Sequence, residues 1–162
     1  MTLLPEGYRL RQGYSKDRAL LVKFMNETYQ ELFPEQQNFS HLAETVKKYY
    51  SSQTPLWLIE LSSDTQKIST PIGCLWMGTA VDQVTGERYA HIFLVYVAVA
   101  HRHQGIATAL LDEAQNWAIQ RNNHQIGLHV FLHNQPALNL YRRFGFEPQS
   151  LSMIKPLSNK SS

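Results

Sequence analysis

A segment that could bind phosphate lies in the second half of the sequence. A run of apolar, mostly β-branched residues ends at Val99, and Arg102, Gly105 and Ala107 follow where an amphipathic helix begins. The first turn of a helix leaves backbone N–H groups without partners and carries partial positive charge. Gly105 and Ala107 would let a ligand approach the backbone closely, and Arg102 adds a cation. The segment predicts a pyrophosphate site, although an ordinary helix start fits the same spacing.

Two common nucleotide-binding motifs do not fit this segment. The Gly-Lys-Ser/Thr ending of a P-loop is missing. The Gly-x-Gly-x-x-Gly pattern of dinucleotide folds is missing too, and that fold would need a series of parallel strand–helix–strand units from the N-terminus.

Two motifs together resemble the GNAT superfamily of N-acetyltransferases. Arg102, Gly105 and Ala107 are similar to the family's pyrophosphate motif, Arg/Gln-x-x-Gly-x-Gly/Ala. Residues 134–146, NQPALNLYRRFGF, are similar to the family's Asn-x-x-Ala-x-x-Leu-Tyr-x-x-x-Gly-Phe. The resemblance is strong from about residue 92 to residue 146 and only topological before residue 56.

The resemblance implies an acetyl-CoA co-substrate and no metal. In the family, the strand before the motif binds the pantetheine arm, and backbone N–H groups of the motif bind the pyrophosphate. Carried over by position, the expected cofactor contacts are Val97, Val99, Arg102, His103, Gln104, Gly105, Ile106, Ala107, Thr108, Asn134 and Tyr141.

Acetyl transfer to an amine needs a proton acceptor for the amine and a proton donor for the leaving thiolate. Tyr141 matches the tyrosine that donates this proton in many relatives, although a tyrosine at this helical spacing could simply pack in the core. His91 stands where many relatives carry a glutamate base, and His129 on the next strand is a second candidate. Each histidine could instead be an ordinary hydrogen-bonded strand residue. Tyr96 or a chain of water molecules would be further alternatives for the base.

The acceptor side is less clear from the sequence. In the family this side is built from the first two helices, which here suggests Tyr29, Glu31 and Phe33. The acceptor is expected to be an amine-bearing small molecule, a peptide or protein N-terminus, or a lysine, and a homodimer is possible. The alternative function is a catalytically silent acyl-CoA-binding or sensor module on the same fold, which the unusual histidine at the base position favours.

Composition sets limits on other classes of function. The chain has 162 residues and a net charge of +2 without a block of Lys or Arg, which speaks against nucleic acid as a partner. The longest strongly apolar run is about nine residues, against roughly 20 for a spanning helix, so no membrane partner is expected. The N-terminus does not read as a signal peptide, and the single Cys74 fits a reducing compartment. We therefore expect a cytoplasmic protein. His91, His129 and His133 do not have the spacing of a zinc motif.

These residues must be positioned by a mixed α/β sheet in one GNAT-like domain, residues 1–162. Hydrophobic periodicity and turn residues predict the order β-α-α-β-β-β-α-β-α-β. The acceptor-side helices fall within about residues 1–55, and the acetyl-CoA-binding core within 90–146. The expected strands are 8–14, 56–61, 72–81, 89–99, 125–132 and 151–157, with a polar connection over 62–71. The expected helices are 17–33, 40–50, 105–122 and 136–144.

Overall fold

The computed structural model describes residues 3–62 and 70–158, so most of the connection expected over 62–71 lies outside the described residues. A five-stranded sheet of order β1-β2-β3-β4-β5 is antiparallel throughout, except that β4 and β5 run parallel. The strands are β1 (Tyr8–Gln12), β2 (Leu56–Leu61), β3 (Gly73–Val81), β4 (Arg88–Val97) and β5 (Ile126–Leu128). The helices are α1 (Arg18–Leu32), α2 (His41–Tyr49), α3 (Ile106–Gln120) and α4 (Gln135–Phe144), with short 3-10 turns at Ser15–Asp17 and Val99–His101.

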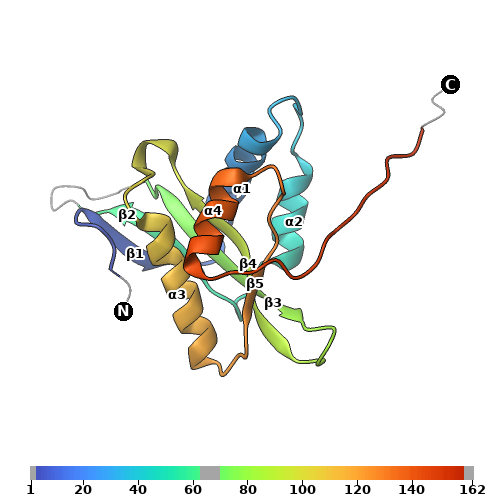
Figure 1. The fold of residues 1–162 in the computed structure, drawn as a ribbon. Coiled ribbons are helices and arrows are strands. Elements are labelled where there is room, and N and C mark those ends of the chain that lie inside the picture. The colour runs from blue at the N-terminus through green and yellow to red at the C-terminus, as the bar shows by residue number, and fades with distance from the viewer. Residues whose placement is uncertain (1–2, 63–69, 159–162) are drawn as a thin grey trace.

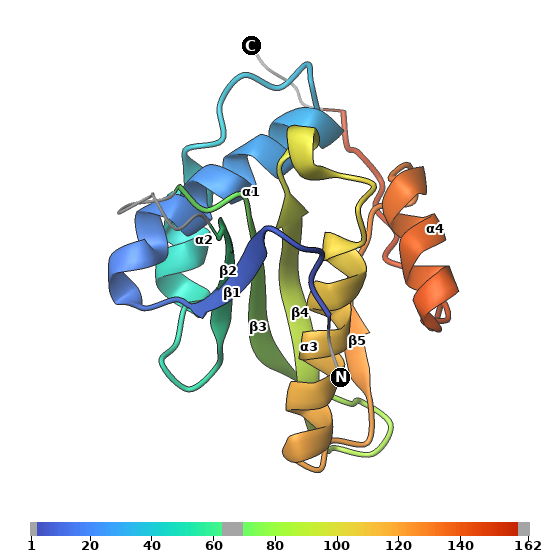
Figure 2. The ribbon, with the colours of Figure 1, turned by 90° about the vertical axis from the view of Figure 1, so that its left-hand side faces the viewer.

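Helices cover both faces of the sheet. Figures 1 and 2 show α1 and α2 on one face and α3 on the other, with α4 beside α3. Successive strand residues therefore enter different cores: Leu58 and Trp76 pack under α1 and α2, whereas Ile59 and Met77 pack under α3. Strands buried on both faces read as continuous apolar runs, which explains the sequence of the central strands.

A bulge in β4 creates an opening in this sheet. Met77 pairs with Ile92 but the preceding residue, Trp76, pairs with Leu94, so Phe93 is an extra residue in the ladder. Its ring occupies the space above Gly78, where any side chain would collide with it. A bulge bends its strand and increases the local twist. On its other edge, β4 pairs with β5 only through Ala90–Ile92, so the second half of β4 has no strand partner on that side among the described residues.

The fold class agrees with the sequence, but the prediction of a final strand is wrong. Residues 151–157 are exposed and form no strand, because they have no pairing partner among the described residues. The strand expected over 125–132 is confined to β5 for a related reason: β4 separates from it after Leu128. Elsewhere the predicted boundaries differ from the observed ones by two residues at most. Among the described helices, none combines the length and apolar character that a membrane crossing requires.

Candidate cofactor and active site

A cavity of about 500 Å³ lies at the open edge of β4. Three elements meet there: the end of β4, the start of α3 and the inner side of α4, with α1 closing one side. Its lining residues are Thr28, Glu31, Leu32, Val95, Tyr96, Val97, His101, Arg102, His103, Gly105, Ile106, Ala107, Thr108, His133, Asn134, Pro136, Ala137, Leu140, Tyr141 and Arg143. Residues from both motifs of the sequence are thus brought to one cavity.

The start of α3 has the properties of an anion site. Gly105 precedes the helix in the left-handed conformation, with φ of 88°, and no side chain caps the helix. His103 also has a positive φ of 64°. A Cβ built on Gly105 would meet no other atom within 4 Å, so the backbone here faces open space. The N–H groups of the first helical turn cannot be satisfied within the helix. A pyrophosphate group fits this arrangement of donors and open space.

The end of β4 offers backbone groups to an extended ligand. Val95, Tyr96 and Val97 line the cavity on the edge where β5 has ended. Unpaired N–H and C=O groups on a strand edge are a template for hydrogen bonding to another extended chain. The carbonyl of Val97 already accepts a hydrogen bond from Arg102 Nε at 2.7 Å. Val99, in contrast, lies in the 3-10 turn that follows, does not line the cavity, and is 71% exposed.

Arg102 is not the free cation that the sequence suggested. Its guanidinium donates two hydrogen bonds to the Glu31 carboxylate, at 2.6 and 2.9 Å. These bonds hold the pKa of Glu31 below its usual value and raise that of Arg102. Next to this pair, the Tyr96 hydroxyl donates to Glu27 on the same helix. Arg102 therefore joins β4 to α1, and its charge is largely neutralised by Glu31.

Helix α4 carries the remaining residues of the second motif. Asn134 is its N-cap and accepts a hydrogen bond from the Ala137 N–H at 3.4 Å, while Gly145 ends the helix with φ of 111°. Tyr141 lines the cavity and contacts the Phe146 ring. Burial raises the pKa of its phenol, so Tyr141 is protonated at neutral pH and has a proton to donate.

The two candidate bases lie next to each other but outside the cavity lining. The rings of His91 and His129 are 5.0 Å apart, and His91 also contacts Phe93, which packs against the core under α1 and α2. His91 is only 8% exposed, and its Nδ1 has no hydrogen-bond partner among the described residues. Burial first, and the charge of His129 second, lower the pKa of His91 to about 4. His91 is therefore neutral at pH 7 and has a vacant acceptor nitrogen or a free N–H.

Two of the three expected acceptor residues, Tyr29 and Phe33, belong to an aromatic cluster that joins α1 to the loop before α4. Tyr29 and Phe33 stack at 6.2 Å, and both contact Phe131 edge-on. His133 packs on Phe33 and hydrogen-bonds the carbonyl of Leu32. Of the three residues expected on the acceptor side, only Glu31 lines the cavity itself.

Several residues of this site carry no signal in the sequence. Tyr8 on β1 hydrogen-bonds His101 at 2.7 Å and Gln104 at 3.3 Å, which ties the first strand to the loop before α3. Gln104 does not line the cavity. Arg143 adds a cation from α4. One and two residues after Tyr141, α4 carries the pair Arg142-Arg143, and a basic residue on the cavity side of that helix is the signal that could have identified Arg143.

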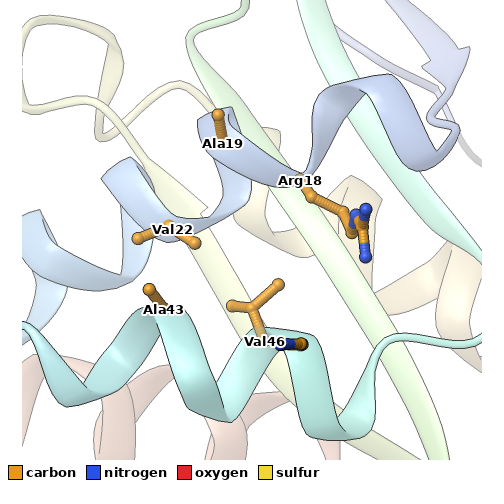
Figure 3. A pocket seen from close by; sticks show the side chains of 6 residues that line it. Arg18, Ala19, Val22, Ala43 and Val46 are labelled. Carbon is orange, nitrogen blue, oxygen red and sulfur yellow. The ribbon is translucent and has the colours of Figure 1, made fainter.

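A second hollow of about 240 Å³ lies between α1 and α2 (Figure 3). It shares no residue with the first cavity, and it contains no candidate catalytic group. Its lining residues are Arg18, Ala19, Val22, Ala43, Val46 and Lys47.

Comparison with known proteins finds similar proteins among the acetyltransferases. An N-acetyltransferase of unassigned role from Bacillus subtilis, YdgE, is 28% identical over 82 residues, 51% of this chain and 52% of the relative. The chain spans about half the length of the curated relatives it matches. Two solved structures share the fold. An aminoglycoside acetyltransferase from an uncultured soil metagenomic sample, in complex with trehalose, has a TM-score of 0.68 at 15% identity and covers 96% of this chain and 100% of its own.

The aminoglycoside N-acetyltransferase AAC(6')-Iy, in complex with CoA, has a TM-score of 0.65 at 16% identity and covers 96% of this chain and 99% of its own. At sequence identities this low, the similarity of these two structures to this chain shows a shared fold and no shared substrate. The family model described as "Acetyltransferase (GNAT) family" matches residues 22–146, which include the cavity and both motifs. The chain belongs to the GNAT family of acetyltransferases.

Proposed function

We propose that this protein is an acetyl-CoA-dependent N-acetyltransferase that acetylates a primary amine by direct attack within a ternary complex. The observation that carries the proposal is the convergence on one cavity of an uncapped helix start, an open strand edge and a half-buried tyrosine. The first two suit the pyrophosphate and the amide-rich arm of CoA, and the third suits the departing thiol.

Binding would use mainly backbone groups. The first-turn N–H groups of Ile106, Ala107 and Thr108 would hold the pyrophosphate, with Gly105 keeping the approach open. The edge of β4 at Val95–Val97 would pair with the pantetheine arm. One consequence is that Arg102 would act by fixing α1 against β4 through Glu31, and would contribute little net charge toward phosphate.

Tyr141 and the histidine pair divide the proton transfers. Acetyl-CoA supplies the thioester, whose carbonyl carbon the neutral amine attacks. A strand N–H near Val97 would donate a hydrogen bond to the carbonyl oxygen as it gains charge. Tyr141 would donate its phenolic proton to the CoA sulfur as the carbon–sulfur bond breaks. His91, or His129 beside it, would take the proton that the amine loses, through water because neither ring lines the cavity.

The acceptor is proposed only as a class. Helix α1 forms one side of the cavity, and the aromatic cluster of Tyr29, Phe33 and Phe131 near the end of that helix would pack against the carbon skeleton of an amine and attract its cationic form. Glu31 is engaged by Arg102 and Glu27 by the Tyr96 hydroxyl, which leaves the aromatic faces as the groups that would select for an amine. The aminoglycoside acetyltransferases that share the fold make aminoglycosides one of the amines to test first.

Two measurements test the proposal. Thermal unfolding with saturating acetyl-CoA should show a rise of a few degrees that the same concentration of AMP does not reproduce, since a ligand at about 100 times its Kd adds roughly 2.7 kcal/mol. Release of free CoA thiol should then be followed with an aminoglycoside, a polyamine, lysine and a peptide with a free N-terminus. A folded sample without a specific thermal shift would refute the cofactor site. A shift without turnover on any amine would favour a silent acyl-CoA-binding module.

A further inference from the structure

A histidine beside the proposed phosphate site is held by a residue of the first strand. His101 lines the cavity from the 3-10 turn that precedes α3. Its ring nitrogen Nδ1 lies 2.7 Å from the hydroxyl of Tyr8 on β1, and the two rings meet edge-on. The Tyr8 ring packs against the core beneath α3, which fixes the position of its hydroxyl. The side chain of His101 is therefore oriented before any ligand arrives.

The contact with Tyr8 leaves one nitrogen of His101 for a ligand. Nε2 has no hydrogen-bond partner among the described residues. The Tyr8 hydroxyl has one proton, which it can donate to His101 Nδ1 or to Gln104 Oε1 at 3.3 Å. When Nδ1 is the acceptor, the neutral imidazole carries its own proton on Nε2. Nε2 is then a donor on a residue that lines the cavity, and a phosphate oxygen is an acceptor that suits it.

The other basic side chains of the cavity are less prepared to bind a phosphate. Arg102 and His133 are both engaged by α1, through a carboxylate and a backbone carbonyl. His103 and Arg143 are exposed, and no hydrogen bond to another described residue holds either side chain. A side chain that becomes ordered only on binding loses affinity to conformational entropy. His101 avoids most of that loss, because Tyr8 already holds it.

We propose that His101 binds a phosphate group of acetyl-CoA through Nε2, and that Tyr8 is the residue that positions it. The proposal rests on the proposed cofactor site, because it adds a side-chain donor to the backbone N–H groups at the start of α3. It makes the first strand of the sheet, 93 residues away from His101, a determinant of cofactor affinity. The phosphate is either the pyrophosphate or the ribose phosphate of CoA, and the test below distinguishes the two.

The first test is calorimetry of CoA binding. His101→Phe keeps an aromatic ring beside Tyr8 but has no donor, and it should raise the Kd for CoA about tenfold. His101→Gln keeps an N–H donor and should raise the Kd about threefold at most. A side chain that served only for packing would give the opposite order. That order, or an unchanged Kd in His101→Phe, overturns the proposal. With dephospho-CoA, which lacks the ribose phosphate, the effect of His101→Phe persists for a pyrophosphate contact and disappears for a ribose phosphate contact.

The second test asks whether Tyr8 acts through His101. Tyr8→Phe should raise the Kd for CoA about threefold in the wild-type background and leave it unchanged in the His101→Phe background, where the hydroxyl has no imidazole to hold. The control Tyr14→Phe, at an exposed tyrosine outside the cavity lining, should leave the Kd unchanged in both. Equal losses from Tyr8→Phe in the two backgrounds would refute the positioning role. Wild-type protein that does not bind CoA refutes the proposed cofactor site, whereas binding that none of these variants weakens refutes only this proposal.

Discussion

Replacing His91 with phenylalanine should remove a pH-dependent part of the stability of this protein. The histidine is buried, and its pKa in the folded protein is about 4, below the ordinary value of 6.5. As the pH falls below 6.5, the unfolded chain binds the proton first, so protonation favours unfolding. This contribution to stability is complete above pH 6.5 and is lost as the pH falls toward 4.

The size of the effect follows from the two pKa values. A difference of one pKa unit corresponds to about 1.4 kcal/mol, so the whole effect is roughly 3 kcal/mol, of which about 2 kcal/mol falls between pH 7 and pH 5. Carboxylates such as Asp17 and Glu31 have lowered pKa values and stay ionised over this range. Phenylalanine keeps a ring beside Phe93 and removes the titrating nitrogen whose Nδ1 lacks a partner.

The assay is urea unfolding at pH 7 and pH 5, for the wild-type protein and for His91→Phe. The wild-type protein should lose about 2 kcal/mol more than the variant between the two pH values. The exposed His41 supplies the control, since His41→Gln should behave as the wild-type protein does. Equal losses in the wild-type protein and His91→Phe would refute the argument from burial, and with it the view that His91 is neutral when an amine binds.

Four further predictions concern the cavity and its frame. Tyr141→Phe should lower kcat for CoA thiol release by about 10² or more, with little change in KM for acetyl-CoA, because only the proton donor is lost. Gly105→Ala should cost about 1 kcal/mol of stability, because the residue has a positive φ. It should also weaken acetyl-CoA binding in calorimetry at least about tenfold, because the added Cβ enters the open space of the proposed phosphate site. The control Gly86→Ala, at a turn glycine with a similar φ of 78°, should show the loss of stability without the loss of affinity. Asn134→Ala should lower the free energy of unfolding by about 1 kcal/mol and Asn134→Asp by less, since aspartate still caps α4. Glu31→Gln should change the unfolding free energy by less than about 1 kcal/mol, because the ion pair with Arg102 is partly exposed; a larger loss in urea unfolding would contradict that estimate.

The local structure around the predicted cofactor site was accessible from the sequence because its signals are local. A glycine at a helix start and an apolar strand before it act within a few residues of themselves, and α3 begins directly after Gly105 as the sequence indicated. The N-cap role of Asn134 at α4 was not predicted. The fold class followed in the same way from the spacing of apolar residues. The roles of Tyr141, His91 and His129 in the reaction remain predictions.

Long-range choices were not accessible. Arg102 is separated from Glu31 by 71 residues, and nothing near either residue indicates that the cation turns to α1 instead of phosphate. The hydrogen bond between Tyr8 and His101 was not predicted for the same reason, since these residues are also far apart in the sequence. The absent strand at 151–157 shows a further limit: the sequence pattern can indicate that a segment suits a sheet, but whether a neighbouring strand is available to pair with it depends on residues far away in the sequence.

The extra residue at Phe93 makes the sheet less regular but leaves part of the edge of β4 open. Ile92 faces α3 and Leu94 faces α1, so deleting Phe93 would leave every other side chain of β4 on its present face and restore an uninterrupted ladder with β3. The straightened strand would stay alongside β5 beyond Ile92. The backbone N–H and C=O groups of its last residues would then be paired with the extended β5. We expect such a protein to have a more regular sheet and no open strand edge at Val95–Val97, so the cavity beside the end of β4 depends on one inserted residue.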